Sequence, residues 1–163
     1  MKKYYISLLC VLALMISPAL LKAQGSVKIT GEVTTPLDLK LADMQRFKQT
    51  SVTRKDRDGN DHTYSGVVLA ELLQKAGATM GKDLKGENLT KFISVEASDG
   101  YQVVFALAEL DKDFTDRTII LASMMDGKPL PNGDGPFRII VQDEKKPARC
   151  IKMVTGIKVM FAK

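Results

Sequence analysis

The residues of this 163-residue chain that could hold a ligand are few, and most of them are basic. Lys145, Lys146, Arg149 and Lys152 form its one dense cluster of positive charge. Guanidinium and ammonium groups that converge on one point suit a phosphate or another small oxyanion. The cluster therefore indicates either a solvated loop or an anion site. It is too small to favour nucleic-acid binding, which needs a concentrated basic face.

His62 is the only histidine in the chain. A Ser-His-Asp triad would depend on it, and no Gly-x-Ser-x-Gly motif accompanies it, so we expect no hydrolase. We interpret His62 as a surface histidine beside a turn. Asp56, Asp58 and Asp61 lie near it, but a calcium loop would need its glycine later and a closing glutamate where Val67 stands. We therefore assign no catalytic residue and predict no metal site here.

The first 23 residues have the pattern of a cleavable secretory signal. Lys2 and Lys3 precede an apolar run over residues 6–16, and Ala23 supplies a small residue at a suitable cleavage point. The run is shorter than the ~20 residues that span a bilayer. We predict a signal peptide over 1–23, a single domain over 24–163, and export to the periplasm or the medium, with no membrane span after cleavage.

Cleavage would change both the charge and the cysteine content. It removes Lys2, Lys3 and Lys22 but no acidic residue, so that 24 basic residues become 21 against 19 acidic ones. It also removes Cys10, which leaves Cys150 as the one remaining cysteine of the two. A lone thiol cannot form an intramolecular disulfide, and we interpret Cys150 as a small buried core residue.

Several short segments have the composition or the period-two alternation of strands. They cover residues 27–33, 49–54, 92–97, 101–105, 118–124, 137–141, 150–154 and 157–161. The almost wholly apolar run 118–124 should lie in the middle of a sheet. A short helix is expected over 42–47, and the principal helix over about 67–77, capped by Ser65 and ended by Gly77. Because no regular βαβ alternation appears, we predict an α+β fold with a mainly β core.

An ordered series of motifs adds a family resemblance. The blocks cover residues 64–77, 97–101, 121–130, 135–141 and 148–153, and they end in Gly-x-x-Arg-x-x-Val and Ala-Arg-x-x-Lys. From about residue 39 to the end, the series resembles the molybdopterin-binding domain of sulfite-oxidase-type oxidoreductases. The resemblance implies the sulfite-oxidase-like fold, molybdopterin as the candidate cofactor, and a pterin and phosphate pocket lined by Arg138, Arg149 and Lys152.

The chain departs from that family at the metal. In the enzymes, a cysteine thiolate between the second strand and the principal helix bonds molybdenum, whereas residues 49–64 contain no cysteine. Cys150 falls where the family usually carries a small residue, and Met153 replaces a tryptophan. The given sequence is also far shorter than those enzymes, which add a second domain, and its signal suits export of an unfolded chain.

We therefore predict an exported domain that binds a small anionic or pterin-like ligand, or a partner redox protein, through Arg138, Arg149 and Lys152. We expect it to act without molybdenum redox catalysis. Two alternatives stay open. One is a genuine molybdopterin-dependent oxidoreductase, or a subunit of one, in which oxygen ligands or Cys150 hold the metal. The other is a purely structural or interaction domain.

Overall fold

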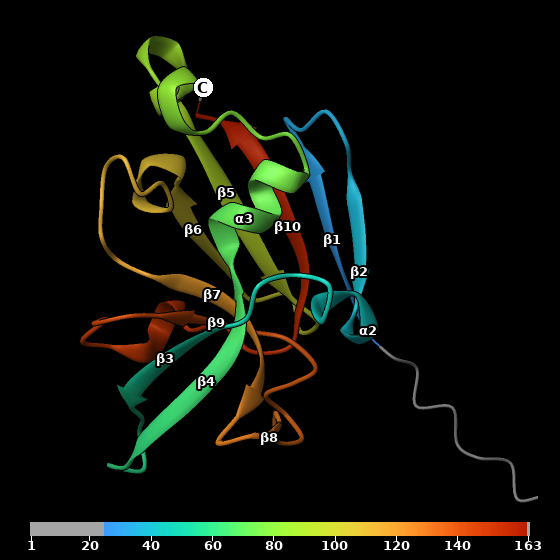
Figure 1. Cartoon of the computed structure of the whole chain (residues 1–163), viewed down its shortest axis with the longest axis vertical. Helices are drawn as coiled ribbons and strands as arrows, with labels where there is room; N and C mark the ends of the chain where they lie inside the picture. The colour runs from blue at the N-terminus through green and yellow to red at the C-terminus, as the bar shows by residue number, and fades with distance from the viewer. Residues whose placement is uncertain (1–24, 163) are drawn as a thin grey trace, which may run out of the picture.

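The computed structural model describes residues 25–162, so the predicted signal peptide lies outside the described residues. Two five-stranded sheets, which we call sheet A and sheet B, form most of this part (Figure 1). Across sheet A the strands are β2 (Leu37–Lys40), β1 (Ser26–Gly31), β10 (Val154–Phe161), β5 (Lys91–Ala97) and β6 (Gln102–Ala106). Across sheet B they are β3 (Thr50–Lys55), β4 (Asp61–Val68), β7 (Ile119–Met125) and β8 (Lys128–Pro129), with β9 (Arg138–Val141) also paired to β7.

In sheet A, the first and last strands of the described chain lie side by side. Strands β1 and β10 run parallel, with Ile29 opposite Ile157, and the other neighbouring strands run antiparallel. Val27 and Ile29 are fully buried, whereas Lys28 between them is exposed. This is the alternation that the sequence predicts for a strand with one face on the core.

Strand β7 lies between β4 and β9 and is buried on both faces. Ile119 and Leu121 join the core between the sheets, while Ile120 and Ala122 join a second, smaller cluster on the other face of sheet B. The prediction that the apolar run 118–124 forms a central strand is therefore confirmed. The second cluster also contains Tyr64.

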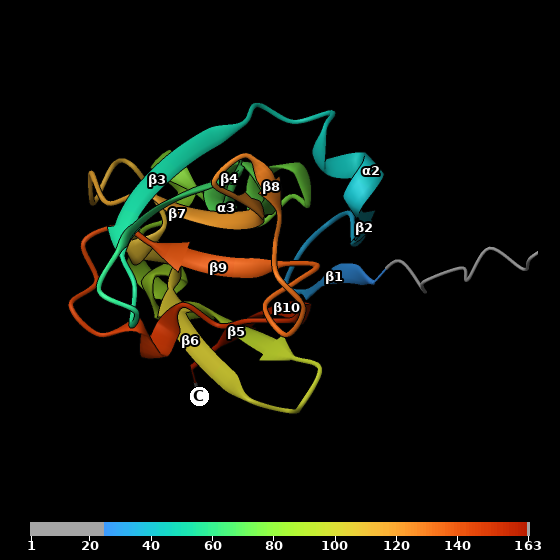
Figure 2. The ribbon, with the colours of Figure 1, turned by 90° about the horizontal axis from the view of Figure 1, so that it is seen from below.

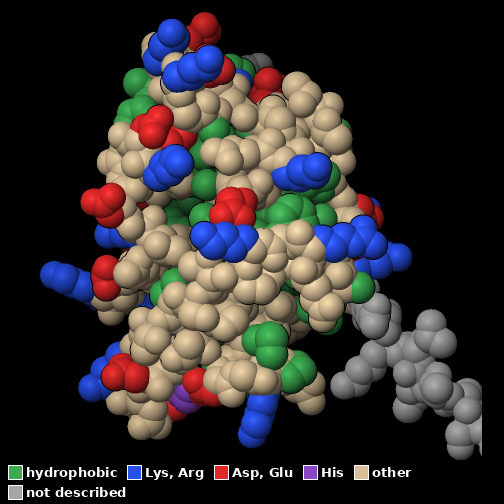
Figure 3. All heavy atoms as spheres, viewed as in Figure 1, with side chains coloured by type: hydrophobic (Ala, Val, Ile, Leu, Met, Phe, Trp, Pro, Cys, Tyr) green, Lys and Arg blue, Asp and Glu red, His purple; other side chains and the backbone are tan. Residues whose placement is uncertain are grey.

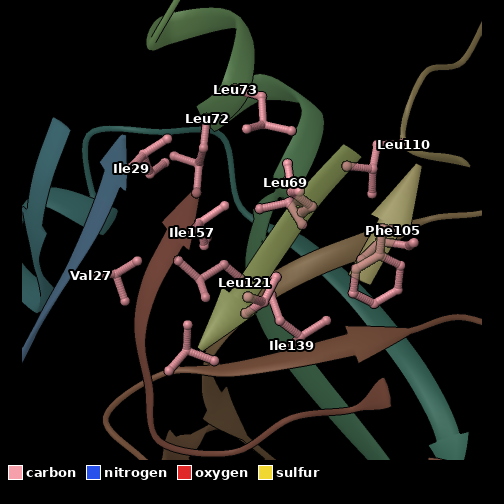
Figure 4. Packing of buried hydrophobic residues seen from close by; sticks show 14 of the residues in the cluster. Val27, Ile29, Leu69, Leu72, Leu73, Phe105, Leu110, Leu121, Ile139 and Ile157 are labelled. Atoms are coloured by element: carbon pink, nitrogen blue, oxygen red, sulfur yellow. The ribbon is translucent and has the colours of Figure 1, made fainter. Parts of the chain in front are cut away.

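The main core lies between the two sheets and under the principal helix. Figure 4 shows Ile157 of sheet A close to Leu121 and Ile139 of sheet B, with Leu69 and Leu72 above them. All five side chains are buried to within 1%. Burial of this apolar surface, at roughly 25 cal/mol per Å², is the main stabilising contribution to the fold.

The principal helix is shorter than predicted, because α3 spans Leu69–Lys75. Ser65, Val67 and Val68 belong to β4, where Ser65 pairs with Met124 and Val67 with Leu121. The hydrogen bonds between β4 and β7 stabilise Ser65 as part of a strand more than a local preference stabilises it as a helix cap. The prediction that Ser65 caps the principal helix is therefore wrong. Gly77 does follow the helix, at φ +75°, as predicted for a residue that must adopt the left-handed conformation.

The remaining helical elements are short. They are α2 (Leu41–Met44), inside the predicted segment 42–47, and the 3₁₀ turns η2 (Gly81–Asp83), η3 (Gly86–Thr90), η4 (Leu107–Glu109) and η5 (Pro147–Arg149). None of the helices within residues 25–162 is long and apolar enough to cross a membrane.

The predicted strand over 150–154 is also wrong, since β10 begins at Val154. Met153 has φ +48°, which interrupts extended backbone just before the strand. The segment instead makes isolated bonds, in which Ile139 N–H donates to the Ile151 carbonyl at 2.8 Å and Met153 N–H to the Asp134 carbonyl at 2.9 Å. An irregular loop therefore packs beside β9 and brings its side chains to the edge of sheet B.

Gly66 allows β4 and β7 to approach each other closely. A Cβ atom at this position would lie 2.1 Å from the Leu121 carbonyl oxygen and 2.5 Å from the Ala122 Cα. The strand register shifts between Ser65 and Gly66. A glycine is required here because the backbone of the neighbouring strand occupies the space of any side chain.

Candidate functional site

A hollow of about 670 Å³, which we call the pocket, opens between the β3–β4 hairpin and the β5–β6 hairpin. Asp56, Arg57, Asp58 and His62 line it from the β3–β4 side. Figure 2 shows the two hairpins on opposite sides of β9, which carries Arg138 at its start. The pocket therefore lies against sheet B, beside the smaller hydrophobic cluster.

The opposite wall is less charged. It comes from the β5–β6 hairpin, with Asp99 and Tyr101, and from the loop before β10, with Lys152 and Met153. The Tyr101 hydroxyl donates to the Ala148 carbonyl at 3.2 Å and so connects these two segments. The ring of Tyr101 remains half exposed at the rim.

Strand alternation explains why several charged side chains share this face of sheet B. Residues two apart on a strand point to the same side. Val52 on β3 pairs with Tyr64 on β4, and both belong to the smaller cluster. The next pair on the same face, two residues along each strand, is Arg54 with His62. Arg138 lies on this face as well, because it is two residues before Ile140 on β9 and Ile140 belongs to the same cluster.

Arg138 is buried, with 4% of its side chain exposed, and both of its terminal nitrogens have acceptors. Its Nη1 donates to Asp134 Oδ2 and to the Tyr64 hydroxyl, both at 2.8 Å, and to Asp56 Oδ2 at 3.3 Å, while Nη2 lies 3.4 Å from Asp56 Oδ1. The guanidinium carbon also lies 5.0 Å from the centre of the Tyr64 ring. These contacts hold the floor of the pocket together.

The carboxylate of Asp56 is kept ionised by the same network. Burial tends to raise its pKa, but the hydrogen bond from the Tyr64 hydroxyl and the nearby charges of Arg138 and Arg54 lower the pKa below its ordinary value. Burial and the bond to Asp56 raise the pKa of Tyr64. At neutral pH, Tyr64 therefore remains a protonated hydroxyl that donates a hydrogen bond, while Asp56 is negatively charged and Arg138 positively charged.

The three cations predicted as ligand-binding residues do not converge. Lys152 pairs with Asp134 at 2.5 Å and, like Arg138, lines the pocket. Arg149 does not line it. Its guanidinium binds Glu144 and Glu109, each at 2.9 Å, and lies 4.7 Å over the Phe105 ring.

Cys150 is buried, as predicted, and it also lines the pocket. Arg54 Nη1 donates to its sulfur. Burial raises the pKa of the Cys150 thiol, against the lowering effects of the Val141 backbone and the charge of Arg54. The thiol is therefore protonated at neutral pH, and a protonated thiol is a poor nucleophile and metal ligand.

His62 lies partly exposed at the surface beside the β3–β4 turn, as interpreted from the sequence, and it also contacts two carboxylates. Its Nδ1 lies 2.6 Å from Asp126 Oδ2 and its Nε2 lies 2.9 Å from Asp58 Oδ2. Asp126, in the turn between β7 and β8, also accepts the Thr63 N–H at 2.9 Å. The hydrogen bonds to Asp58 and Asp126 raise the pKa of His62 to about 9, so it is a cation at neutral pH and connects the β3–β4 hairpin to that turn.

Sequence reasoning missed most of the pocket. It considered Asp56 only for calcium and gave Arg54, Arg57 and Asp134 no role. Within residues 25–162, no group of three or more His, Cys, Asp or Glu side chains could hold a metal ion. The sequence did contain a signal, since Arg54 and Asp56 are spaced by two at the end of β3, and His62 and Tyr64 by two on β4. Only the pairing of β9 with β7 adds Arg138.

Three comparisons relate this geometry to known proteins. Residues 16–163 match the family model described as "Oxidoreductase molybdopterin binding domain". None of the curated proteins matches the chain. Among solved structures, the sulfane dehydrogenase SoxCD from Paracoccus pantotrophus is similar, with a TM-score of 0.62 and 20% sequence identity. The match covers 83% of this chain and 38% of that chain, so this chain spans less than half the length of its structural neighbour.

Proposed function

The chain belongs to the oxidoreductase molybdopterin-binding domain family, and from this premise we propose that it is an exported binding domain whose pocket takes a small anionic or pterin-like ligand without molybdenum redox catalysis. The family match and the structural neighbour confirm the resemblance, the mainly β fold and its sulfite-oxidase-like class. The export, the ligand and the lack of redox chemistry are parts of the proposal.

The residues present do not fit a thiolate-bound molybdenum centre. In the resemblance, the metal-bonding cysteine lies between the second strand and the principal helix. Here that segment lines the pocket with Asp56, Arg57, Asp58 and His62, and none of these supplies sulfur. The remaining thiol, Cys150, is protonated and bonded to Arg54. We therefore derive no reaction step through molybdenum.

The observation that carries the proposal is a pocket of about 670 Å³ that keeps cations on both walls without a ligating thiolate. A hollow of this size lies within the usual range for small-molecule sites. Arg57 and Lys152 are exposed within it, and an anion gains charge-assisted hydrogen bonds from such groups. A neutral interaction surface would have no need of them.

Native mass spectrometry of the protein purified from a bacterial exporting host tests this proposal. We expect a retained small molecule, or saturable binding of added pterin-6-carboxylate. The control variant is Ala148→Trp, which places a large side chain at the exposed rim and should abolish binding while the fold persists. If the wild-type protein retained nothing and bound neither pterin-6-carboxylate nor inorganic pyrophosphate, the structural or interaction alternative would replace the proposal.

One observation favours a second candidate, a subunit of a molybdopterin-dependent oxidoreductase, because Cys150 lines the pocket. On this reading a partner redox protein would complete the site, and the metal would have to displace Arg54 from the Cys150 sulfur. Exchange of Cys150 for Ser distinguishes the candidates. Loss of a bound cofactor would favour the oxidoreductase, whereas unchanged ligand binding would favour the binding domain.

A further inference from the structure

We propose that two copies of this chain pair with each other through strand β6, edge to edge and antiparallel, so that sheet A of one copy continues into sheet A of the other. Strand β6 is an outer strand of sheet A and lies beside β5 (Figure 2). The residues of β6 do not line the pocket. The inference therefore goes beyond the proposed function, and either can fail without the other.

One set of alternate residues in β6 bonds to β5. At the start of the strand, the Tyr101 carbonyl accepts the Ala97 N–H at 2.9 Å. In an antiparallel pair, every second residue exchanges backbone hydrogen bonds with the neighbouring strand. Val103 and Phe105, two and four residues after Tyr101, therefore make the next bonds to β5.

The other residues of β6 turn their backbone N–H and C=O groups outward. Ala106 shows this directly, because its N–H donates to Glu109 Oε1 at 3.3 Å rather than to β5. Gln102 and Val104 share its orientation, and no hydrogen bond from residues 25–162 reaches their outward groups. A second extended backbone is the partner that satisfies such a row, because its donors and acceptors have the same spacing.

Strand β6 also lacks the features that usually keep an edge strand from pairing. It has five residues with no charge and no proline, and its pairing with β5 shows no shift in register. The other outer strands of the described chain differ. Strand β2 has four residues, including Asp38 and Lys40, β3 ends in Arg54 and Lys55, and β8 has two residues. Edge pairing is therefore expected at β6.

A second copy suits this edge because β6 is compatible with its own sequence. A two-fold axis brings the same surface of both copies together, so a charged strand would place like charges side by side, whereas β6 places none. Val104 is 56% exposed, so pairing also removes apolar surface from water. When Gln102 of one copy lies opposite Val104 of the other, the outward groups of both are satisfied and Ala106 keeps its bond to Glu109.

The dimer should be weak, because two strands of this length bury less than the roughly 1,200 Å² of a stable interface. Sedimentation equilibrium of the mature protein tests the pairing. We expect the apparent mass to rise from that of a monomer toward twice that value as the concentration increases to about 1 mM. Wild-type protein that remained a monomer at this concentration would overturn the proposal.

Val104→Pro is the variant that removes an outward donor. It leaves the bonds of Val103 and Phe105 to β5 in place, and an edge strand tolerates proline where the N–H faces outward. We expect association to weaken about tenfold or more. The matched control, Val104→Thr, keeps both the donor and the branched shape and should dimerise like the wild type. Circular dichroism checks the fold, and equal association of a folded Val104→Pro would overturn the pairing.

Hydrogen exchange in the wild-type protein supplies a measurement that needs no variant. The exchange of the Gln102 and Val104 amides should slow as the concentration rises, since pairing protects them. Thr30→Glu, on β1 and three strands away from β6, should dimerise like the wild type. If it abolished the dimer, or if the two amides kept their exchange rates while the mass doubled, the copies would meet at another surface and the proposal would be wrong.

Discussion

At the scale of single residues, the charged groups of the pocket divide into those that hold the fold and those that face a ligand. Arg138 and Asp56 belong to the first group, because they satisfy each other and Tyr64 in a largely buried site. Arg57 and Lys152 belong to the second, because they are exposed at the opening. The division follows from burial, since a buried charge needs partners and an exposed one does not.

Replacing Arg138 by Met should strongly destabilise the domain. The change leaves Asp56 without its main cation and Asp134 with Lys152 alone, and breaking a buried ion pair in this way costs about 3 kcal/mol of unfolding free energy. Urea denaturation measures the loss. The control, Arg149→Met, removes partly exposed ion pairs and should cost no more than about 1 kcal/mol. Equal losses in the two variants would contradict the structural role of Arg138.

His62 should titrate far above its ordinary pKa. Its two carboxylate partners raise the pKa from 6.5 to about 9, so the protonated ring stabilises the folded state. Because the folded pKa is the higher one, this stabilisation is complete below pH 6.5 and is lost as the pH rises through 9. As the only histidine, it gives a single set of ring signals by nuclear magnetic resonance in untagged protein.

A midpoint near 6.5 for those signals would show that the contacts to Asp58 and Asp126 do not form in solution. The matched variant His62→Gln supplies an independent check. The stability difference between wild type and His62→Gln should be largest below pH 6.5 and should decrease between pH 6.5 and 9. A difference that grew with pH would have the wrong sign.

At the scale of elements, local pattern predicted the strands well and their ends less well. Val27 and Ile29 alternate with polar residues, and the run 118–124 is apolar throughout, so both were found from sequence. The start of α3 was misplaced because Ser65 and Val67 pair with β7, and a cap preference of about 1 kcal/mol cannot compete with a strand ladder. That pairing is a tertiary effect which local sequence does not contain.

Gly66 is the position where the approach of β4 to β7 can be tested. Gly66→Ala would place a methyl group 2.1 Å from the Leu121 carbonyl oxygen, so the strands must separate, at a cost of about 3 kcal/mol or more. Gly156→Ala in β10 is the control, because its new methyl group would lie 4.0 Å from its nearest contact. Urea denaturation of both variants compares them, and a similar cost in the two would contradict the close approach.

At the scale of the whole molecule, the pocket joins segments that are far apart in the chain. Asp56, Tyr101, Arg138 and Lys152 come from two hairpins, strand β9 and one loop. The family resemblance predicted the fold and placed Arg138 and Lys152 at the site, but it could not show that Arg149 turns toward Glu109 and Glu144. Such pairings depend on the complete packing, which single-sequence patterns do not specify.

The charge distribution agrees with a small ligand rather than an extended polyanion. On the face shown in Figure 3, basic side chains are interspersed with acidic ones and do not form a continuous stripe. Mixed charges of this kind weaken the long-range attraction that nucleic-acid binding requires. The absence of a nucleic-acid partner therefore stays a prediction that this face supports.

Export is a prediction about the whole chain. We expect a bacterial exporting host to remove residues 1–23, so that the mature protein begins at Gln24. Intact-mass measurement of the protein from the periplasm or the medium checks this directly. The control is Ala23→Trp, which replaces the small residue at the cleavage point and should accumulate as the precursor. Recovery of full-length wild-type protein would contradict the predicted signal peptide.

The absence of a bound molybdenum atom is the central claim, and elemental analysis of the mature wild-type protein tests it most directly. The protein is purified without denaturation from a host that synthesises molybdopterin, and the ratio of molybdenum to protein is determined by mass spectrometry. We predict a ratio far below one that does not change in Cys150→Ser. A ratio near one that falls when Cys150 is replaced would contradict the claim.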